Sequence, residues 1–522
     1  MSLVDGYHLG VRPRWGVSMV FDAELEDSTS PRREFLRRAG QAVVAGVVLG
    51  ASVAAADEST PLRRAAKVLA DRVRGSVVVR GTPEYEPWRQ SMVWNYRKFR
   101  RFPDVIVQAI DDDDVVAAVQ FARQQRIKIT TRSGGHSWSG CFLRDGGVLV
   151  DLSRMQSIDV DVARSEARVQ PGVIGRALNA HLARSGLAFP TAHCGMVPIS
   201  GFLMGGGLGL NSVAWGGMSV FNIRAIDLVT AQGDKLHASP EQNADYYWAA
   251  RGGGPGLFFT VTCFYLHCYP LPRAITTDTY LLPYGELVGL AQAMNDLGPR
   301  IDQSVELLAV VIPAPPGLAA NCTPDPCRQI AVLSANAFGD TEKQSRAMLA
   351  TLARHPLLRK PLQKIAGRAT PFEVLYQDNE GPFPQRRARA DNIYVDQVVE
   401  ATQVLSRHMP ISPAPGNTPV ILWRGTDPYP DAAYTARGRF YFAAYAQWDD
   451  PADDLLNEGW LKDLYDELEP LATGHYINEF DRETRAYRTN QCYSAANWQR
   501  LGDLRRRYDP DGVYQTFLGL SS

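Results

Sequence analysis

The residues best suited to chemistry are a histidine and a cysteine that each lie in a glycine-rich segment. His136 ends the run Ser133-Gly134-Gly135-His136, which follows the apolar segment 127–131. Cys194 precedes Gly195 at the start of a second glycine-rich segment. Neutral imidazole and thiolate are nucleophiles that can attack an electron-poor ring. Glycines after a strand let backbone N–H groups surround an anion.

These glycine loops match neither of two common nucleotide-binding motifs. Residues 195–209 lack the G-x-G-x-x-G pattern that opens a helix and the Gly-Lys-Ser/Thr of a Walker A loop. A third glycine cluster follows Arg251 at residues 252–254. The three loops together predict one large, planar, phosphate-bearing ligand. Taken alone, His136 is also compatible with a tight turn, and Cys194 with a small core residue.

The elements that must position these residues follow an α/β order. Segments 104–109, 127–131 and 147–152 are typical of strands, and 112–125 is typical of an amphipathic helix. Glycines become sparse beyond residue 272, where strands and long helical patterns alternate as far as residue 490. We therefore predict one domain at 57–272, a second at 273–490, and a C-terminal segment at 491–522.

Several blocks in the right order resemble one family. They are 132–137 (Arg-Ser-Gly-Gly-His-Ser), the cysteine-containing loop 194–209, and the segments 222–233, 247–254, 497–501 and 508–510. Over residues 88–520 the chain resembles a berberine bridge enzyme-like flavoprotein of the p-cresol methylhydroxylase and vanillyl-alcohol oxidase superfamily. The resemblance implies an α+β fold with a PCMH-type FAD-binding domain that the last segment rejoins. A second α+β domain, built on an antiparallel sheet, would bind the substrate.

The resemblance also implies which residues hold FAD. His136 would be bonded to the flavin 8α-methyl carbon and Cys194 to C6 of the same ring, which would raise the reduction potential of the flavin. Neighbouring His193 is expected to make local hydrogen bonds rather than a second attachment. The expected cofactor-binding residues are Arg132, Ser133, Gly134, Gly135, His136, Ser137, Cys194, Gly195, Gly201, Gly205, Gly206, Gly207, Gly209, Ile223 and Asn497.

A flavin oxidase needs a base whose pKa lies near the working pH. In segment 475–481, expected to be a strand, Glu479 takes the position where the family commonly has a catalytic tyrosine. Desolvation beside a flavin would raise the pKa of this carboxyl group. The alternative is a strand-edge acid paired with Arg482 or Arg485. The expected catalytic residues are Glu479, Tyr493 and Tyr476.

The chain departs from its relatives at other expected site positions. Phe442 and Ala444 align with a lysine and a glutamine of alcohol-oxidising plant members, so sugar or monolignol substrates are not expected. Tyr441, Tyr445 and Trp448 are expected to line an apolar pocket, with alternate residues in the core. Phe202 replaces a histidine that relatives have beside the pyrimidine end of the flavin. Ala192 is a small residue at the family's oxygen-access position, which favours an oxidase.

The first 56 residues are predicted to be an export signal. Arg32-Arg33, followed by Phe35 and Leu36, resembles the twin-arginine type, and an uncharged run at 39–56 ends in three alanines. A membrane anchor or a buried helix is the alternative. Residues 322 and 327, two of the seven cysteines, lie in a proline-rich loop where a short disulfide can form outside the cytoplasm. These features predict a periplasmic or secreted protein.

Composition restricts the class of partner. The 522 residues carry 55 Lys and Arg against 56 Asp and Glu, which argues against general nucleic-acid binding. No zinc-ligand spacing is present, and no membrane span is expected after signal removal. We therefore expect a small organic substrate, an alcohol or amine with a ring system, and O2 as acceptor. The alternatives are a dehydrogenase that uses a quinone or cytochrome, and a flavin-binding protein without turnover.

Overall fold

The computed structural model describes residues 60–319 and 329–520. The predicted export signal and the predicted Cys322–Cys327 disulfide lie outside these residues. In the described part of the chain, no helix is both long enough and apolar enough to cross a lipid bilayer. The fold is α+β, as predicted, and contains three large sheets.

The first sheet has the strand order β1-β2-β4-β3, in which β2, β4 and β3 are parallel and β1 is antiparallel. Its strands are β1 (Ser76–Val79), β2 (Val105–Gln108), β3 (Ile129–Arg132) and β4 (Val148–Asp151), and the helices before and between them are α2 (Pro61–Ala70), α3 (Tyr85–Ser91) and α4 (Asp112–Gln125). Residues 112–125 form the predicted helix, because its local signals agree. The Asp111 side chain accepts the Asp114 N–H at 3.0 Å, and Val115, Ala118 and Ala122 are buried on one face.

The second sheet, in the order β5-β6-β10-β8-β9, is antiparallel. Its strands are β5 (Ile158–Asp161), β6 (Glu166–Val169), β8 (Ile223–Val229), β9 (Lys235–Ala238) and β10 (Thr260–His267). The intervening chain forms α5 (Gly175–Ala183), α6 (Ile199–Met204), α7 (Ala244–Ala250) and a two-strand ribbon of β7 (Leu187–Ala188) and β11 (Tyr269–Pro270). The second and third glycine loops both lie within this region.

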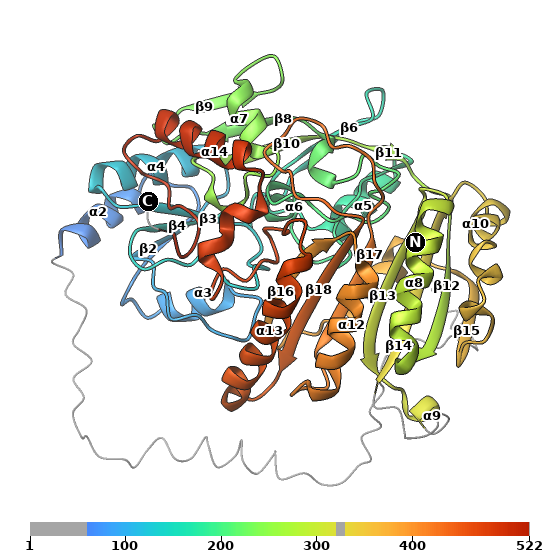
Figure 1. The fold of residues 1–522 in the computed structure, drawn as a ribbon. Coiled ribbons are helices and arrows are strands. Elements are labelled where there is room, and N and C mark those ends of the chain that lie inside the picture. The colour runs from blue at the N-terminus through green and yellow to red at the C-terminus, as the bar shows by residue number, and fades with distance from the viewer. Residues whose placement is uncertain (1–59, 320–328, 521–522) are drawn as a thin grey trace, which may run out of the picture. The chain divides into compact units, whose positions relative to one another are not determined.

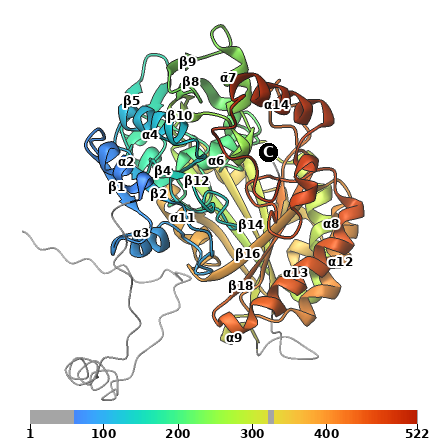
Figure 2. The same cartoon turned by 90° about the vertical axis from the view of Figure 1, so that its left-hand side faces the viewer.

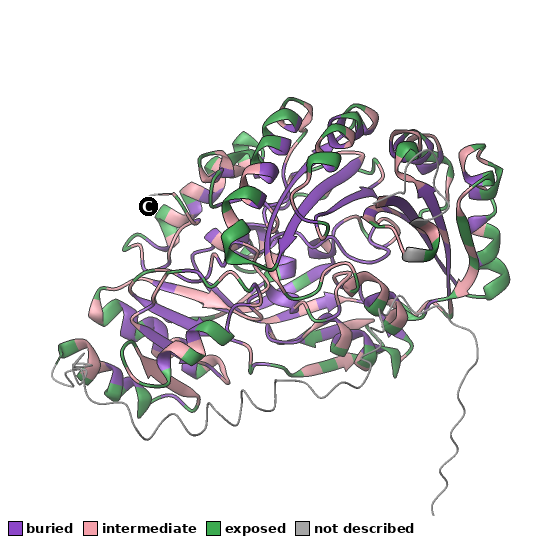
Figure 3. Cartoon of the chain, turned by 90° about the horizontal axis from the view of Figure 1, so that it is seen from below, coloured by how far each residue is buried: buried purple, intermediate pink, exposed green. Residues whose placement is uncertain are grey.

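The third sheet has seven strands, all paired antiparallel, in the order β15-β12-β14-β13-β17-β18-β16. Its strands are β12 (Ala274–Pro283), β13 (Val305–Pro313), β14 (Gln329–Gly339), β15 (Gln363–Ala369), β16 (Arg387–Val395), β17 (Thr418–Trp423) and β18 (Phe440–Trp448). This is the predicted antiparallel sheet. Its strands are largely buried in Figure 3, while the outward sides of the surrounding helices are exposed.

Helices cover one face of this sheet. Helices α8 (Leu287–Leu297), α12 (Val398–His408) and α13 (Asp454–Leu468) lie side by side there (Figures 1 and 2), and their apolar residues share one core with alternate strand residues. Short helices α9 (Pro316–Ala319), α10 (Glu342–Leu349) and α11 (Phe372–Glu380) lie in the connections. The other face packs against residues of the second sheet and its loops.

The C-terminal segment returns to the first sheet. After α14 (Ala495–Tyr508), Ile129 of β3 donates to the Val513 carbonyl at 2.8 Å, and Gln515 donates to the Ile129 carbonyl at 2.9 Å. The Tyr508 hydroxyl also donates to Asp245 of α7 at 3.0 Å. The C-terminal segment therefore packs against two segments that lie far from it in the sequence, β3 and α7.

Candidate functional site

His136 lies in the loop after β3, stacked on Trp94. The two ring centroids are 5.4 Å apart with the planes at 23°. Burial, with a smaller contribution from the charge of Arg132, lowers the pKa of His136 to about 4. The imidazole is therefore neutral near pH 7, and neither ring nitrogen has a hydrogen-bond partner within the described residues. An unpartnered neutral imidazole fits attachment to an electron-poor ring.

The same loop presents a row of free donors. In the part of the chain that the structure describes, the backbone N–H groups of residues 134–137 donate to no protein acceptor. Gly135 has φ +72°, and a Cβ there would lie 1.9 Å from the Met92 carbonyl oxygen, so the turn requires glycine. Arg132 anchors the loop base through Asp151, with Nη1 2.5 Å from the carboxylate. Consecutive unpartnered N–H groups fit a phosphate.

Cys194 lies between two acidic groups. Burial, followed by the charges of Glu380 and Glu479, raises the pKa of the Cys194 thiol to about 12. The N–H of the next residue, Gly195, donates to Glu380 at 2.9 Å. Cys194 is unpaired, and its thiol is protonated near pH 7. Neighbouring His193 makes an ion pair with Glu306 of β13 at 3.1 Å, and not the local hydrogen bonds that were expected.

The other predicted cofactor-binding residues lie in α6 and the loop after it, in β8 and in α14. Gly205, Gly206, Gly207 and Gly209 follow α6, where a Cβ on Gly206 would lie 2.6 Å from the Tyr434 ring. Gly201 lies within α6, where a Cβ would lie 4.0 Å from the Ser133 Oγ of the His136 loop. Ile223 begins β8 and is buried. Asn497 lies in α14, and its side-chain amide donates to the Ala432 carbonyl at 2.7 Å. The Asn497 side chain therefore holds the backbone at Ala432.

Glu479 lies in a turn, not in the strand that the sequence predicted. Its carboxylate accepts short hydrogen bonds from the hydroxyls of Tyr441 and Tyr445 on β18. Burial raises the pKa of Glu479, and the two tyrosine hydrogen bonds oppose that rise only partly. A buried carboxyl group with a raised pKa can accept a proton near neutral pH.

The alternative pairing of Glu479 with arginine is wrong. Arg485 makes its ion pair with Asp391 at 2.6 Å, and no ion pair joins Glu479 to Arg482 or Arg485 in the described residues. The turn is held instead by Asn392 of β16, whose side chain accepts the Tyr476 N–H at 2.7 Å and donates to the Tyr476 carbonyl at 3.0 Å. A neighbouring strand therefore fixes where Glu479 projects.

Tyr476 and Tyr493 occupy different surroundings. The Tyr476 hydroxyl accepts the Gly207 N–H at 3.2 Å and so touches the second glycine loop. Tyr493 donates to the Gly253 carbonyl at 3.1 Å and packs against Trp498 and Phe517. The structure brings Tyr476 to the same turn as Glu479. Within the described residues Tyr493 makes no hydrogen bond with either and no ring contact with Tyr476.

The register of β18 corrects one expectation. Tyr441, Ala443 and Tyr445 face the core shared with the glycine loops. Phe442, Ala444 and Trp448 face the opposite, helix-covered core. Trp448 therefore lines no pocket with the two tyrosines, and its indole N–H donates to Asp454 at 2.6 Å. Phe442 and Ala444 therefore do not face the glycine loops, because strand neighbours point to opposite faces.

Sequence reasoning missed the aromatic residues around Glu479. Trp138, two residues beyond His136, lies 5.2 Å from the Tyr445 ring and 5.4 Å from Trp94. Phe383 lies 4.9 Å from Tyr445 on another side. The position of Trp138 directly after the His136 loop was the available signal. These rings pack around Tyr445, one of the two tyrosines that bond to Glu479, and burial of the Glu479 carboxyl group raises its pKa.

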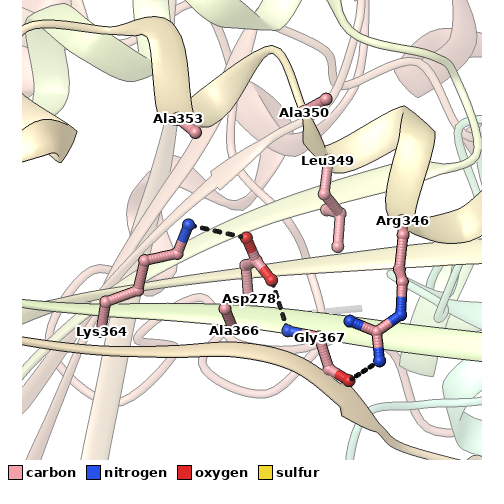
Figure 4. Close-up of a pocket in the computed structure, with 8 residues that line it drawn as sticks. All are labelled: Asp278, Arg346, Leu349, Ala350, Ala353, Lys364, Ala366 and Gly367. Carbon is pink, nitrogen blue, oxygen red and sulfur yellow. Dashed lines mark hydrogen bonds and ion pairs between the residues drawn. The ribbon is translucent and has the colours of Figure 1, made fainter.

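A pocket of about 180 Å³ lies elsewhere, between β12, β15 and α10 (Figure 4). Asp278 is 3.3 Å from Lys364 Nζ and accepts the Gly367 N–H at 2.7 Å, while Arg346 donates to the Gly367 carbonyl at 3.1 Å. Its polar groups thus pair with one another. The pocket contains none of the predicted site residues.

Comparisons with known proteins identify an FAD-binding domain in this chain. Residues 103–239 match an FAD binding domain family. The chain is 29% identical over 436 residues to the FAD-linked oxidoreductase nodO of Hypoxylon pulicicidum, covering 80% of this chain and 91% of the relative. It is 35% identical over 219 residues to (R)-6-hydroxynicotine oxidase of Paenarthrobacter nicotinovorans, covering 41% and 47%.

The fold also matches solved structures. BBE-like 1 of Physcomitrella patens superposes with a TM-score of 0.75 at 21% identity, over 89% of this chain and all of the other. The matched domain includes the His136 loop, the cysteine loop and β8. Residues 103–239 therefore form an FAD-binding domain, and the chain is similar to FAD-linked oxidoreductases over most of its length and shares the fold of BBE-like 1.

Proposed function

We propose that the protein is an exported FAD-linked oxidase that takes a hydride from an organic alcohol or amine with a ring system and is reoxidised by O2, which gives H2O2. Bound FAD would supply the hydride acceptor. The observation that carries the proposal is the partly buried carboxyl group of Glu479, held by the hydroxyls of Tyr441 and Tyr445, with Trp138 packed on the Tyr445 ring. The relative that acts on 6-hydroxynicotine supports a ring-containing amine as one substrate class.

His136 and Cys194 are proposed to hold the cofactor covalently. The unpartnered, neutral His136 imidazole and the free N–H groups of residues 134–137 support this arrangement. Cys194 must lose its proton before it can bond, because its pKa is about 12. The neighbouring carboxylates of Glu380 and Glu479 disfavour the Cys194 thiolate, so we expect the His136 bond to form more readily.

Glu479 is proposed to take the substrate proton, and Tyr441 and Tyr445 to hold its carboxylate in place. Tyr476 is proposed to position the turn against the glycine loop. Tyr493, bonded to the Gly253 carbonyl, is the less favoured base.

Ala192 makes an isolated bridge with Gly209, beside Cys194. Its small side chain supports access of O2 and therefore an oxidase.

Flavin attachment tests the cofactor proposal. We expect flavin to stay on the acid-denatured wild-type chain and on each of the His136→Ala and Cys194→Ala variants, because one bond remains in each. The double variant should release all of its flavin. Absorbance of the precipitated and washed protein measures retention, and His181→Ala on α5 is the matched control. Release from the wild-type chain would contradict both attachments.

The acceptor is tested separately from the cofactor. An oxidase should form H2O2 in step with substrate loss, measured by a coupled peroxidase assay. The alternative, a dehydrogenase, would form little peroxide and turn over rapidly with an artificial quinone. The alternative of a flavin-binding protein without turnover would show no anaerobic bleaching with any member of a panel of cyclic alcohols and amines.

Export is proposed from the sequence alone. In a bacterium with a twin-arginine translocase, the full-length protein should reach the periplasm, and Arg32→Lys/Arg33→Lys should keep it in the cytoplasm. Fractionation and immunoblotting measure this, with Arg12→Lys/Arg14→Lys as control. Equal export of both variants would contradict a twin-arginine signal.

A further inference from the structure

A thiol and three arginines that the proposed reaction does not use surround the chain just beyond His136. Cys141 Sγ is 3.3 Å from the Ser137 hydroxyl. Arg144 donates to the Cys141 carbonyl at 2.9 Å and to the Thr516 carbonyl at 2.5 Å. Arg101 donates to the Ser139 carbonyl. These bonds fix two guanidinium groups against the loop without neutralising their charge.

The third arginine, Arg482, is buried without compensation. It is 2% exposed, and its Nε and Nη1 atoms have no hydrogen-bond partner within the described residues. Burying an unpaired cation costs several kcal/mol in proteins, so a neighbouring anion is expected. The two acids next to it in sequence are engaged elsewhere. Asp481 pairs with Arg389 at 3.1 Å, and Glu483 pairs with Arg97 at 2.9 Å.

Cys141, Cys492 and Tyr493 all interact with the charge of Arg482. Burial raises the pKa of Cys492 and of Tyr493, so Cys141 is left to supply that anion. Burial alone would raise the pKa of Cys141, but Arg482, the Ser137 hydrogen bond, Arg144 and Arg101 together bring it below the ordinary value. The other four described cysteines differ, because burial raises the pKa of Cys263 to about 11 and those of Cys194 and Cys268 to about 12, and also raises that of Cys492. Cys141 is also partly exposed.

We propose that Cys141 is a site of reversible oxidation by hydroperoxides, in which Arg101, Arg144 and the otherwise unpartnered Arg482 hold both the thiolate and its oxidised product. The sulfur attacks one oxygen of H2O2, an S–O bond forms and the O–O bond breaks. Sulfur loses two electrons, hydroxide leaves, and this hydroxide takes the proton of the new S–OH group, which gives water and a sulfenate. The sulfenate keeps a negative charge beside the arginines. Because Ser137 follows His136 directly, the modification would alter the loop proposed to hold the flavin.

The purified holoprotein provides the first test. It is treated with added H2O2 at pH 7, trapped with dimedone, digested and analysed by mass spectrometry. We expect Cys141 to be labelled at least about tenfold faster than Cys263 in the same sample, because labelling follows the thiolate fraction. Equal rates at the two cysteines would overturn the proposal. Added peroxide makes this result independent of oxidase activity.

An arginine variant tests the cause. Arg482→Gln should slow labelling of Cys141 by about tenfold, which corresponds to about one unit in its pKa, and Arg482→Lys should recover most of the rate. Arg359→Gln, an exposed change, is the matched control and should have no effect. Unchanged labelling in Arg482→Gln would overturn the role of the cluster.

The wild-type protein gives a further readout if Arg482→Gln does not fold. The rate of iodoacetamide alkylation at Cys141 should reach half its maximum below pH 9, the ordinary thiol value. A midpoint at or above pH 9 would overturn the proposal. Flavin absorbance, recorded in the same samples, shows separately whether the cofactor proposal holds.

Discussion

A Glu479→Gln variant is expected to lose about 10²- to 10⁴-fold in the rate of anaerobic flavin bleaching, the range typical of a lost general base. Glutamine keeps the size of the side chain and can still accept hydrogen bonds from Tyr441 and Tyr445. It cannot take a proton. The loss should therefore appear in the bleaching step measured by stopped-flow absorbance, while flavin content stays the same.

The pH profile distinguishes a base from a structural acid. Burial raises the pKa of Glu479 above the ordinary glutamate value, although its tyrosine hydrogen bonds oppose this. A base works only when deprotonated, so the wild-type rate should rise with pH through that raised pKa. The profile of Glu479→Gln should lack this inflection.

Glu373→Gln is the matched control for this experiment. Glu373 lies on α11 and pairs at the surface with Arg176 at 3.0 Å. Its loss should leave the bleaching rate within about twofold, as for most surface changes. A Glu479→Gln variant that bleaches at the wild-type rate, with the same inflection, would exclude Glu479 as the base and turn attention to Tyr493.

Features set by neighbouring residues could be predicted from the sequence. Helix α4 follows from the Asp111 cap, three acidic residues in its first turn and apolar residues at helical spacing. The glycine loops could be predicted because their turns need backbone angles that favour glycine, such as φ +72° at Gly135. The family resemblance rests on these blocks, and it led to the FAD-binding domain and the antiparallel sheet.

Features that depend on tertiary register could not be predicted this way. Which of Tyr441 and Phe442 faces the glycine loops depends on how β18 pairs with β16 and β17, and a one-residue slip exchanges the two faces. The turn that carries Glu479 is fixed by Asn392, about 87 positions earlier in the chain. Local propensity carries no information about such a contact.

Ion pairs between β16 and the turn after Glu479 are a second consequence of this register. Arg485 Nη1 lies 2.6 Å from Asp391, which is 1% exposed, and Arg485 also contacts Glu469. Arg488 reaches the same Glu469 at 2.7 Å. Asp391 and Glu469 therefore both rely on Arg485 for an opposite charge, and Asp391 has almost no access to water. This network joins the seven-stranded sheet to the segment that positions the proposed base.

Arg485→Met is therefore expected to lower the free energy of unfolding by about 3–5 kcal/mol, the cost of leaving a buried charge unpaired. Methionine fills much of the volume, so the loss reflects charge rather than a cavity. The midpoint of urea unfolding, followed by tryptophan fluorescence, measures the change. Lys462→Met removes an exposed pair with Asp466 and should cost less than about 1 kcal/mol.

The deficit of Arg485→Met should also depend on pH. Burial already raises the pKa of Asp391 in the wild-type protein, with Arg485 opposing it, so loss of Arg485 raises that pKa further. The folded variant then binds a proton that the unfolded chain releases above about pH 4. Its stability must fall as pH rises from there to the raised pKa, and the deficit must shrink as pH is lowered toward 4. A deficit that does not change with pH would mean that Arg485 acts through packing, because only an unpaired Asp391 carboxylate links the loss to proton uptake.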